Sequence, residues 1–358
     1  MKLIFLKIKR FYEKHTKYAS YGIVSFLILY SIFLSIIIFI NPIGDIDPLS
    51  NEERNFAIVN DLAFKLFSIF LFSIIGISIF HFYKIVNLIH KYFYIVIILF
   101  SFDIFIYERY FLNFSNYEYY SEELPIEFNG YRIAVISDLH YGKLTPDIWV
   151  RSVFQKVNDL KPDLIIGLGD YVLKTKSAKD LYTIWPLLLT LKAKDAEFFI
   201  NGNHESWADE NMSLELLDKS GKSIRNSFKI IEKGKARIVI GGTGDLWTDE
   251  VNIDKTLKDS PESLFTIIAT HNPDVADSKH FRKINLYLAG HTHGGQVRIP
   301  FFNLAPILPV TNKDYDAGFK MNNAGEKLFI SSGIGWSIIP LRFNCRAEVP
   351  IITLKKIF

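Results

Sequence analysis

The chain has 358 residues, which is long enough for two domains. Its hydrophobic fraction of 49% excludes a disordered chain. Its 41 basic and 38 acidic residues give a net charge of +3, and residues 1–110 carry all of that excess. The rest of the chain is formally neutral, which argues against a nucleic-acid binder because such proteins usually carry a basic surplus. The single cysteine, Cys345, excludes an intramolecular disulfide and any cysteine-rich zinc module.

Three apolar runs lie within residues 1–107. Residues 21–40 are 20 uncharged residues, residues 66–83 form a run of 18, and residues 92–107 form a run of 16 that contains Asp103. A helix needs about 20 apolar residues to cross a bilayer core, so we expect a membrane region with three transmembrane helices. Two helices remain an alternative, because a carboxylate such as that of Asp103 costs free energy inside a bilayer.

The loops between these runs predict the orientation. Six basic residues precede the first run, five acidic residues follow it, and Lys84 and Lys91 separate the second run from the third. The positive-inside rule then places the N-terminus and the second loop in the cytoplasm. Three spans put the rest of the chain on the outer face of the cell membrane, which is our prediction for this multi-pass protein, whereas two spans would leave it inside.

Residues 108–129 are rich in tyrosine and phenylalanine, and we interpret them as a juxtamembrane linker. Aromatic side chains collect at the headgroup level of a bilayer, where an apolar ring and a polar tip are both satisfied. A strand or helix that packs on the following domain explains the same composition equally well.

From residue 130 to residue 358, strands and helices alternate. Helices are predicted at 146–160, 177–191 and 209–218. Apolar, β-branched runs predict strands at 132–136, 163–166, 197–200, 237–240, 264–269, 285–289, 327–330 and 349–354. Fully apolar strands separated by helices indicate a sheet covered on both faces, hence an α/β domain.

Polar side chains that can bind metal ions follow five of these strands. They are Asp138 and His140, Asp170, Asn203 and His204, His271, and His291 with His293. Open α/β sheets bind their ligands beyond the carboxyl ends of the strands, so the five groups should converge. Aspartate, asparagine and histidine suit Mn²⁺, Fe or Zn²⁺. Each motif alone is usually a turn or a helix cap, but the ordered set predicts a two-metal site.

These motifs, with the strings Thr270–Asp274, Ala289–Pro300 and Arg342–Glu348, resemble the calcineurin-like metallophosphoesterase superfamily, in its branch of membrane-associated bacterial phosphoesterases. The resemblance covers about residues 130–355 and implies a β-sandwich flanked by helices, here preceded by the transmembrane helices. Leu173 departs from the pattern, since many members carry an aspartate there. Arg346 and Ala347 replace a frequent proline pair.

The resemblance also implies the roles of the site residues. One divalent cation would be held by Asp138, His140, Asp170 and His293, and a second by Asp170, Asn203, His271 and His291. A hydroxide that bridges the two cations would attack phosphorus, and His204 would protonate the leaving group. The implied function is a membrane-anchored hydrolase of phosphodiester or pyrophosphate bonds.

The membrane tether favours a lipid or envelope substrate, and no protein partner is inferred. The apolar segment at residues 300–309 could form a lip for acyl chains or pack into the core. One alternative function is a non-catalytic membrane receptor or scaffold, although every ligand position is filled. Another is a lipid-precursor pyrophosphatase on the cytoplasmic face, if residues 92–107 do not span.

Overall fold

The computed structural model describes residues 96, 99–142, 145–173, 175–338 and 340–358. The chain divides into two compact units, Met1–Phe102 and Asp103–Phe358. In the first unit, the described residues 96 and 99–102 are helical. The second unit contains both sheets and all of the predicted site residues.

The predicted membrane region is described only at its C-terminal end. The expected spans at 21–40 and 66–83 lie outside the described residues. Within the third expected span, Asp103–Tyr107 form a π-helix, η2, which continues into the short helix α4, Glu108–Tyr110. Among the residues described, no helix combines the length and apolar character that crossing a bilayer requires.

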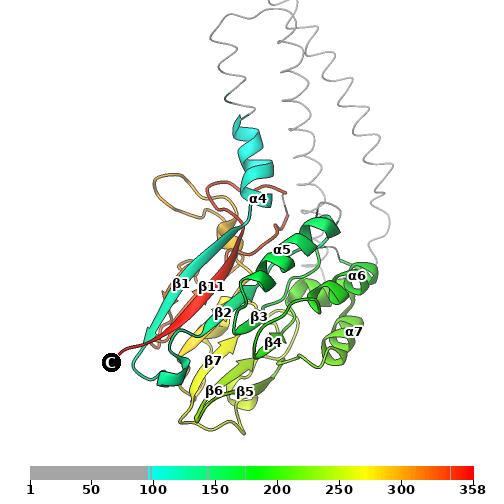
Figure 1. Ribbon diagram of the computed structural model, residues 1–358. Coiled ribbons are helices and arrows are strands. Elements are labelled where there is room, and N and C mark those ends of the chain that lie inside the picture. Colours follow the sequence, from blue (N-terminus) through cyan, green and yellow to red (C-terminus); the bar gives the residue numbers. More distant parts are fainter. Residues whose placement is uncertain (1–95, 97–98, 143–144, 174, 339) are drawn as a thin grey trace, which may run out of the picture. The chain divides into compact units, whose positions relative to one another are not determined.

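Two mixed sheets form the body of the second unit (Figure 1). The first has the strand order β1-β11-β2-β3-β4, with β1 Asn113–Ser121, β2 Arg132–Ile136, β3 Leu164–Gly167, β4 Ala196–Phe199 and β11 Glu348–Lys356. The second has the order β5-β6-β7-β8-β10-β9, with β5 Ser227–Lys233, β6 Ala236–Gly242, β7 Phe265–Ala269, β8 Leu286–Ala289, β9 Gly318–Met321 and β10 Lys327–Ile330.

Alternate residues of the central strands face different layers, as the period of two in a strand requires. Ile133 and Val135 of β2 point into a core between the sheets, where they meet Ile240 of β6 and Leu288 of β8. Ile136 of β2 faces a second core under the helices. These apolar strands are buried on both faces, so the domain is the expected α/β sandwich.

Helices cover both sheets from outside. The longer ones are α5 Asp147–Asp159, α6 Ala178–Leu188 and α7 Asn203–Lys219, and all three pack on the first sheet (Figure 1). The short helices α8 Ile253–Thr256 and η4 Pro273–Asp277 cover the second sheet. Two more 3₁₀ turns occur, η3 Ile126–Phe128 and η5 His293–Gly295.

The predicted strands and helices from residue 130 onward correspond to elements of the structure, with one informative difference. Helix α7 begins at Asn203, six residues before the predicted start. Asp209 has a non-helical backbone (φ −172°), and the apolar pattern is helical only after this kink. The first turn of α7 therefore forms where the sequence suggested a loop, and it carries Asn203 and His204.

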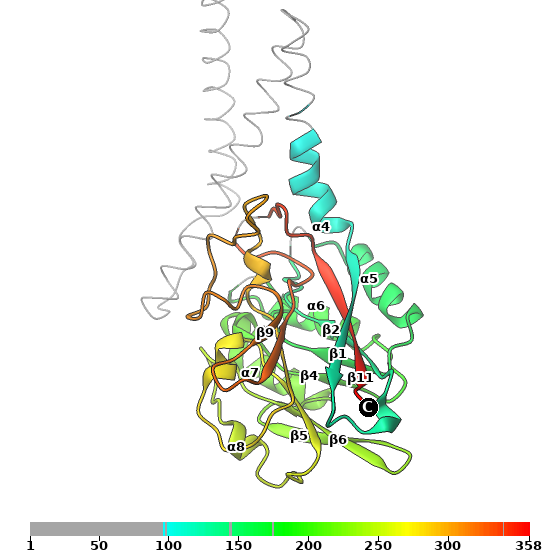
Figure 2. The same cartoon turned by 90° about the vertical axis from the view of Figure 1, so that its left-hand side faces the viewer.

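Residues 113–121 form β1, an edge strand that pairs in parallel with β11 over nine residues (Figure 2). Tyr119 is buried in the core between the sheets, and its hydroxyl donates to the carbonyl of Asn285. Most of the segment that we interpreted as a linker thus belongs to the sandwich, which is the strand alternative left open above.

Candidate metal centre

The predicted ligands gather at one end of the two sheets. Asp138 and His140 follow β2, and Asp170 follows β3. His271 follows β7, and the pair His291 and His293 follows β8. Asn203 opens α7. All seven side chains are buried, none being more than 5% exposed.

Five of these residues adopt a left-handed backbone. The φ angles of Asp138, His140, Asp170, His291 and His293 lie between 47° and 69°. Such a conformation costs a non-glycine residue roughly 1–3 kcal/mol and persists only where surrounding structure enforces it. The strand ends therefore turn abruptly so that each side chain points into the same space.

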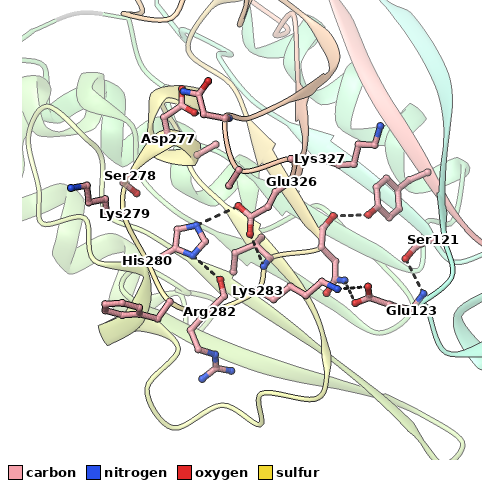
Figure 3. A pocket seen from close by; sticks show the side chains of 18 residues that line it. Ser121, Glu123, Asp277, Ser278, Lys279, His280, Arg282, Lys283, Glu326 and Lys327 are labelled. Atoms are coloured by element: carbon pink, nitrogen blue, oxygen red, sulfur yellow. Dashed lines mark hydrogen bonds and ion pairs between the residues drawn. The ribbon is translucent and has the colours of Figure 1, made fainter.

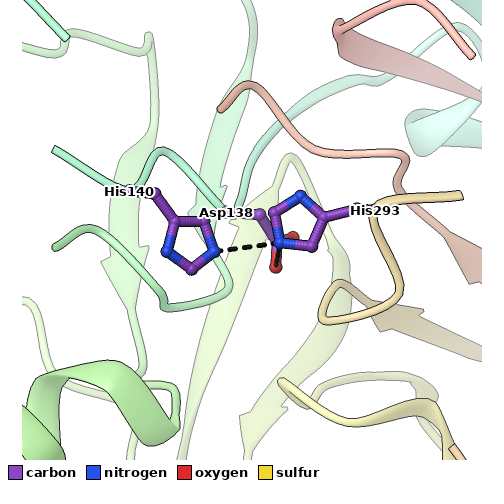
Figure 4. A group of neighbouring side chains, drawn as sticks. All are labelled: Asp138, His140 and His293. Carbon is purple, nitrogen blue, oxygen red and sulfur yellow. Dashed lines mark hydrogen bonds and ion pairs between the residues drawn. The ribbon is translucent and has the colours of Figure 1, made fainter. Parts of the chain in front are cut away.

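The first cluster comprises Asp138, His140 and His293 (Figure 4). The Nε2 atoms of the two imidazoles lie 2.9 Å apart, and Oδ1 of Asp138 lies 3.6 Å from Nε2 of His293. Both oxygens of Asp138 also accept from the backbone N–H of His291, at 2.9 and 3.1 Å. One carboxylate and two imidazole nitrogens are a ligand set suited to a borderline transition-metal ion.

Asp170 joins the first cluster to a second. Its Oδ2 atom lies 3.5 Å from Nε2 of His140 and 3.3 Å from Nε2 of His271. Nδ1 of His291 lies 3.1 Å from Nε2 of His271. Asp170, His271 and His291 thus form a second cluster, and Asp170 is positioned between the two.

Backbone carbonyls determine which imidazole nitrogen faces the centre. Nδ1 of His271 donates to the carbonyl of Leu168 at 2.8 Å, which leaves Nε2 for the cluster. His291 is turned the other way, since its Nε2 donates to the carbonyl of Pro309 at 3.0 Å and its Nδ1 faces inward. Ligand histidines in metalloproteins are usually oriented by such outer hydrogen bonds.

Asn203 opens helix α7 next to His204, whose backbone N–H donates to Oδ1 of Asp170. The side chain of Asn203 is 1% exposed, and its Oδ1 atom has no hydrogen-bond partner among the described residues. A buried amide oxygen is costly without a partner, and a divalent cation would satisfy it. The two clusters can therefore hold two metal ions, and the chemistry of the donors fits both.

Burial and mutual repulsion set the protonation of this centre. Burial lowers the pKa of His291 to about 3, and the positive charge of His271 acts in the same direction. Burial would also lower the pKa of His271, but the carboxylate of Asp170 outweighs it and raises that pKa to about 10. Burial raises the pKa of Asp138 to about 7. The imidazoles of His140, His291 and His293 are therefore neutral, which is the form that binds a cation, whereas His271 must release its proton to a metal ion.

Two glycines make room for the carboxylates. A Cβ atom at Gly202 would lie 2.3 Å from Oδ1 of Asp170, and one at Gly290 would lie 2.6 Å from Oδ2 of Asp138. No side chain fits at either distance. Glycine is required at both positions because the backbone itself packs against a ligand.

The sequence interpretation missed two residues that hold the loops. The carboxylate of Glu205 is fully buried and accepts from the backbone N–H groups of Asp170, Tyr171, Val172 and Gly202, at 2.7 to 3.1 Å. The guanidinium of Arg342 is equally buried and donates to the carbonyls of Ser332, Gly333 and Gly335, among others. Glutamate and arginine are rarely buried, so only their positions within the family strings hinted at these roles.

The two departures from the family pattern can now be located. Nδ1 of His204 donates to the carbonyl of Leu173 at 2.9 Å, so the backbone at this position contacts His204. Arg346 lies over the ring of Tyr107, and the N–H of Ala347 donates to the carbonyl of Glu108. That departure therefore lies at the contact with η2 and α4 and involves no predicted ligand.

A separate cavity of about 1030 Å³ lies elsewhere on the second unit (Figure 3). Its lining includes Asn285, just before β8, and Lys327, at the start of β10, so it lies at the strand ends opposite to the ligands. The half-buried His280 of this cavity contacts Glu326 and the hydroxyl of Tyr287. The predicted metal ligands thus lie at the opposite ends of the strands from this cavity.

A β-sandwich with two His/Asp clusters that share one carboxylate is the arrangement of a dinuclear, metal-dependent phosphoester hydrolase. Residues 131–295 match the calcineurin-like phosphoesterase family. The uncharacterized metallophosphoesterase YkuE of Bacillus subtilis (strain 168) is 30% identical over 239 residues, which is 66% of this chain and 82% of that protein. Phosphodiesterase YaeI of Escherichia coli (strain K12) is 33% identical over 230 residues, 63% of this chain and 82% of that protein.

Among solved structures, a dimetal phosphatase from Danio rerio aligns with a TM-score of 0.35 and 11% identity, covering 57% of this chain and 88% of that chain. On the sequence relationships, the chain belongs to the calcineurin-like phosphoesterase family, and it is a metal-dependent phosphoester hydrolase. The expected superfamily and branch are confirmed.

Proposed function

We propose that this chain is a membrane-anchored phosphoesterase that hydrolyses a phosphodiester or pyrophosphate bond of a lipid or envelope substrate. The observation that carries this proposal is the position of Asp170, whose Oδ2 lies within 3.5 Å of an imidazole nitrogen from each cluster. One cation would be held by Asp138, His140, Asp170 and His293, and the other by Asp170, Asn203, His271 and His291. Two bound cations supply Lewis acidity, which polarises the phosphoryl group and lowers the pKa of water.

His204 is the proposed general acid. Its backbone N–H donates to Oδ1 of Asp170 at 3.0 Å, and its Nδ1 donates to the carbonyl of Leu173. These contacts direct Nε2 toward the centre, where it lies 4.0 Å from Oδ2 of Asp170. Burial lowers the pKa of His204, which makes its imidazolium a stronger acid toward a leaving alkoxide.

The segment that follows the last metal motif supports a lipid substrate. Phe301 is 104% exposed, Phe302 is 80% exposed and Ile307 is 77% exposed, so these side chains do not pack into the core. The segment remains tied to the centre, since the carbonyl of Pro309 accepts from His291. Exposed apolar groups beside a hydrolytic site suit acyl chains or a bilayer surface. In Figures 1 and 2 this orange segment lies at the same end as α4.

Membrane anchoring with the catalytic unit outside is part of the proposal. It is supported by the apolar runs at 21–40, 66–83 and 92–107, by the basic residues before the first run and between the second and third, and by the acidic residues between the first two. A phosphodiesterase activity is supported by the similarity to YaeI. Alkaline phosphatase fused after Phe358 should be active, whereas fluorescence of a cytoplasm-only fluorophore would favour the cytoplasmic lipid-precursor pyrophosphatase instead.

Metal analysis combined with turnover of bis-p-nitrophenyl phosphate tests the activity. We expect about two cations per chain and turnover that a chelator abolishes and added Mn²⁺ restores. Full metal occupancy without turnover would favour the non-catalytic scaffold. Asp170→Asn serves as the matched variant, and it should lower metal content and turnover together.

A further inference from the structure

Two tryptophans line one side of the metal centre. Trp207 lies in the first turns of α7, three residues after His204, so both side chains are on one face of the helix. The rings of His204 and Trp207 have centroids 4.8 Å apart. Trp247 follows β6, and its ring meets that of His291 edge-on at 4.5 Å. The two indoles are stacked at 6.2 Å with an interplanar angle of 24°.

The loop that carries Trp247 is held in place by its own hydrogen bonds. Oδ2 of Asp245 accepts from the N–H groups of Trp247 and Thr248, at 2.9 and 3.0 Å. The hydroxyl of Thr248 donates to that of Ser206 at 3.1 Å, which ties the loop to α7. Asp245 is 3% exposed, whereas Trp247 is 48% exposed. A fixed backbone therefore presents half of an indole to solvent beside the centre.

We propose that Trp207 and Trp247 form the leaving-group subsite and that the group released carries a planar unsaturated ring. This inference rests on the proposed function, because it is the role of His204 as proton donor that assigns this side to the leaving group. The oxygen that His204 protonates must lie next to that imidazole, and the indole of Trp207 is the neighbouring surface. A planar ring attached there would extend along the two indoles toward Trp247.

An aromatic surface distinguishes ring types by its electron distribution. Offset-stacked or edge-to-face aromatic pairs gain free energy beyond the burial of area, whereas a saturated ring of similar size gains mainly from burial. Tryptophan offers the largest such face, and its half-exposed position needs little reorganisation to accept a partner. A saturated acyl chain is better matched by the exposed segment at 300–309, so the two surfaces would bind different ends of one substrate.

Binding of two phosphonates to the metal-loaded protein tests the subsite without requiring turnover. Phenylphosphonate and cyclohexylphosphonate share the group that would face the cations and differ only in the ring. By calorimetry, the wild-type chain should bind the phenyl compound about two- to tenfold more tightly. Trp247→Leu, which keeps an apolar side chain but leaves only one indole, should lower the ratio of dissociation constants, and Trp247→Phe should keep it.

Tyr182→Leu is the control, because Tyr182 is an aromatic residue 61% exposed on α6. Equal affinities in the wild-type chain, or a ratio unchanged in Trp247→Leu, would overturn the subsite. Failure of the proposed function looks different: bis-p-nitrophenyl phosphate would not be hydrolysed, whatever the ratio of the two phosphonates.

Discussion

The carbonyl oxygen of Leu173 accepts a hydrogen bond of 2.9 Å from Nδ1 of His204. A main-chain acceptor persists whatever side chain occupies the position, so the loss of the family's aspartate at Leu173 leaves the imidazole oriented. The same contact places the proton on Nδ1 of the neutral ring and leaves Nε2 to gain and lose a proton.

His204→Ala should retain metal but lose turnover where the leaving group is poor. Removing a general acid typically costs 10²–10⁴-fold in rate, and a p-nitrophenolate needs less protonation than a phenolate. We therefore expect a loss of about 10²-fold or more on bis-phenyl phosphate and a smaller loss on bis-p-nitrophenyl phosphate, both from initial rates. Asn203→Ala is the comparison and should lose metal. Equal metal loss in the two variants would rule out the acid role.

Glu205→Gln should destabilise the fold as well as the centre. Four backbone N–H groups converge on the carboxylate of Glu205, and an amide offers them one oxygen and brings two donors of its own. The free energy of unfolding should fall by roughly 1–3 kcal/mol in urea titrations. Glu215→Gln, on the exposed face of the same helix, is the control and should change little. No difference between the two variants would contradict the positioning role.

The metal-free protein should lose stability as the pH falls below about 6.5. Burial lowers the pKa of His291 to about 3 and holds the pKa values of His140 and His293 well below the ordinary value. Between pH 6.5 and 3 the unfolded chain binds protons at these imidazoles that the folded chain does not, so acid favours unfolding. Urea titrations in chelator, from pH 7.5 to 4, measure this.

Asp138 acts in the opposite direction over part of that range. Burial raises its pKa to about 7, above its ordinary value of 3.8, so between these values the folded chain binds the extra proton and gains stability as the pH falls. Asp138→Asn removes this stabilising contribution, so the free energy of unfolding should fall more steeply as the pH is lowered. A slope that is unchanged or shallower in the variant would be inconsistent with a protonated Asp138 in the metal-free fold.

Gly202→Ala should disturb the second cluster. The added Cβ would lie 2.3 Å from Oδ1 of Asp170 and 2.8 Å from Cε1 of His271, so one ligand must move. Metal analysis should show less than two cations per chain, with turnover reduced in proportion. Gly142→Ala is the matched control, since its nearest contact would be an ordinary 3.4 Å to Leu173. Equal metal content in both variants would mean that the loop at Gly202 can shift without disturbing the ligands.

Phe301→Ser combined with Phe302→Ser should separate lipid from soluble substrates. Both rings are exposed, so their loss should leave stability and hydrolysis of bis-p-nitrophenyl phosphate unchanged. Hydrolysis of a long-chain phosphodiester in vesicles should fall several-fold, since each ring buries apolar area worth about 1.5–3 kcal/mol when it leaves water. Phe281→Ser, equally exposed at the far cavity, should affect neither substrate. Parallel losses on both substrates would argue for a structural role.

Local patterns predicted the strands and the ligands because both depend on neighbouring residues. Ile133 to Ile136 are apolar and buried on both faces, and the polar pair Asp138 and His140 stands directly after them. The edge strand β1 was harder to predict from the sequence, because most of its residues are exposed or half-buried. It is stabilised as a strand by pairing with β11, more than 200 residues away.

The burial of Arg342 and Glu205 could not be predicted from local patterns either. Their partners are backbone groups that come together only when several loops meet. The exposure of Phe301 could not be predicted either, because an apolar run in the sequence does not show whether its side chains are buried or exposed.

The pairing of β1 with β11 determines where the chain can be cut. Strand β11 hydrogen-bonds to β2 on one side and to β1 on the other, and most of its nine residues are buried. Cleavage after Ser121 would allow β1 to separate from β11. The exposed apolar edge of β11 would then be a template for strand addition between molecules, and aggregation should follow. Cleavage before Asn113 would spare the pairing. A catalytic fragment that keeps this pairing should therefore begin between the expected span at 92–107 and Asn113, although the family match begins only at residue 131.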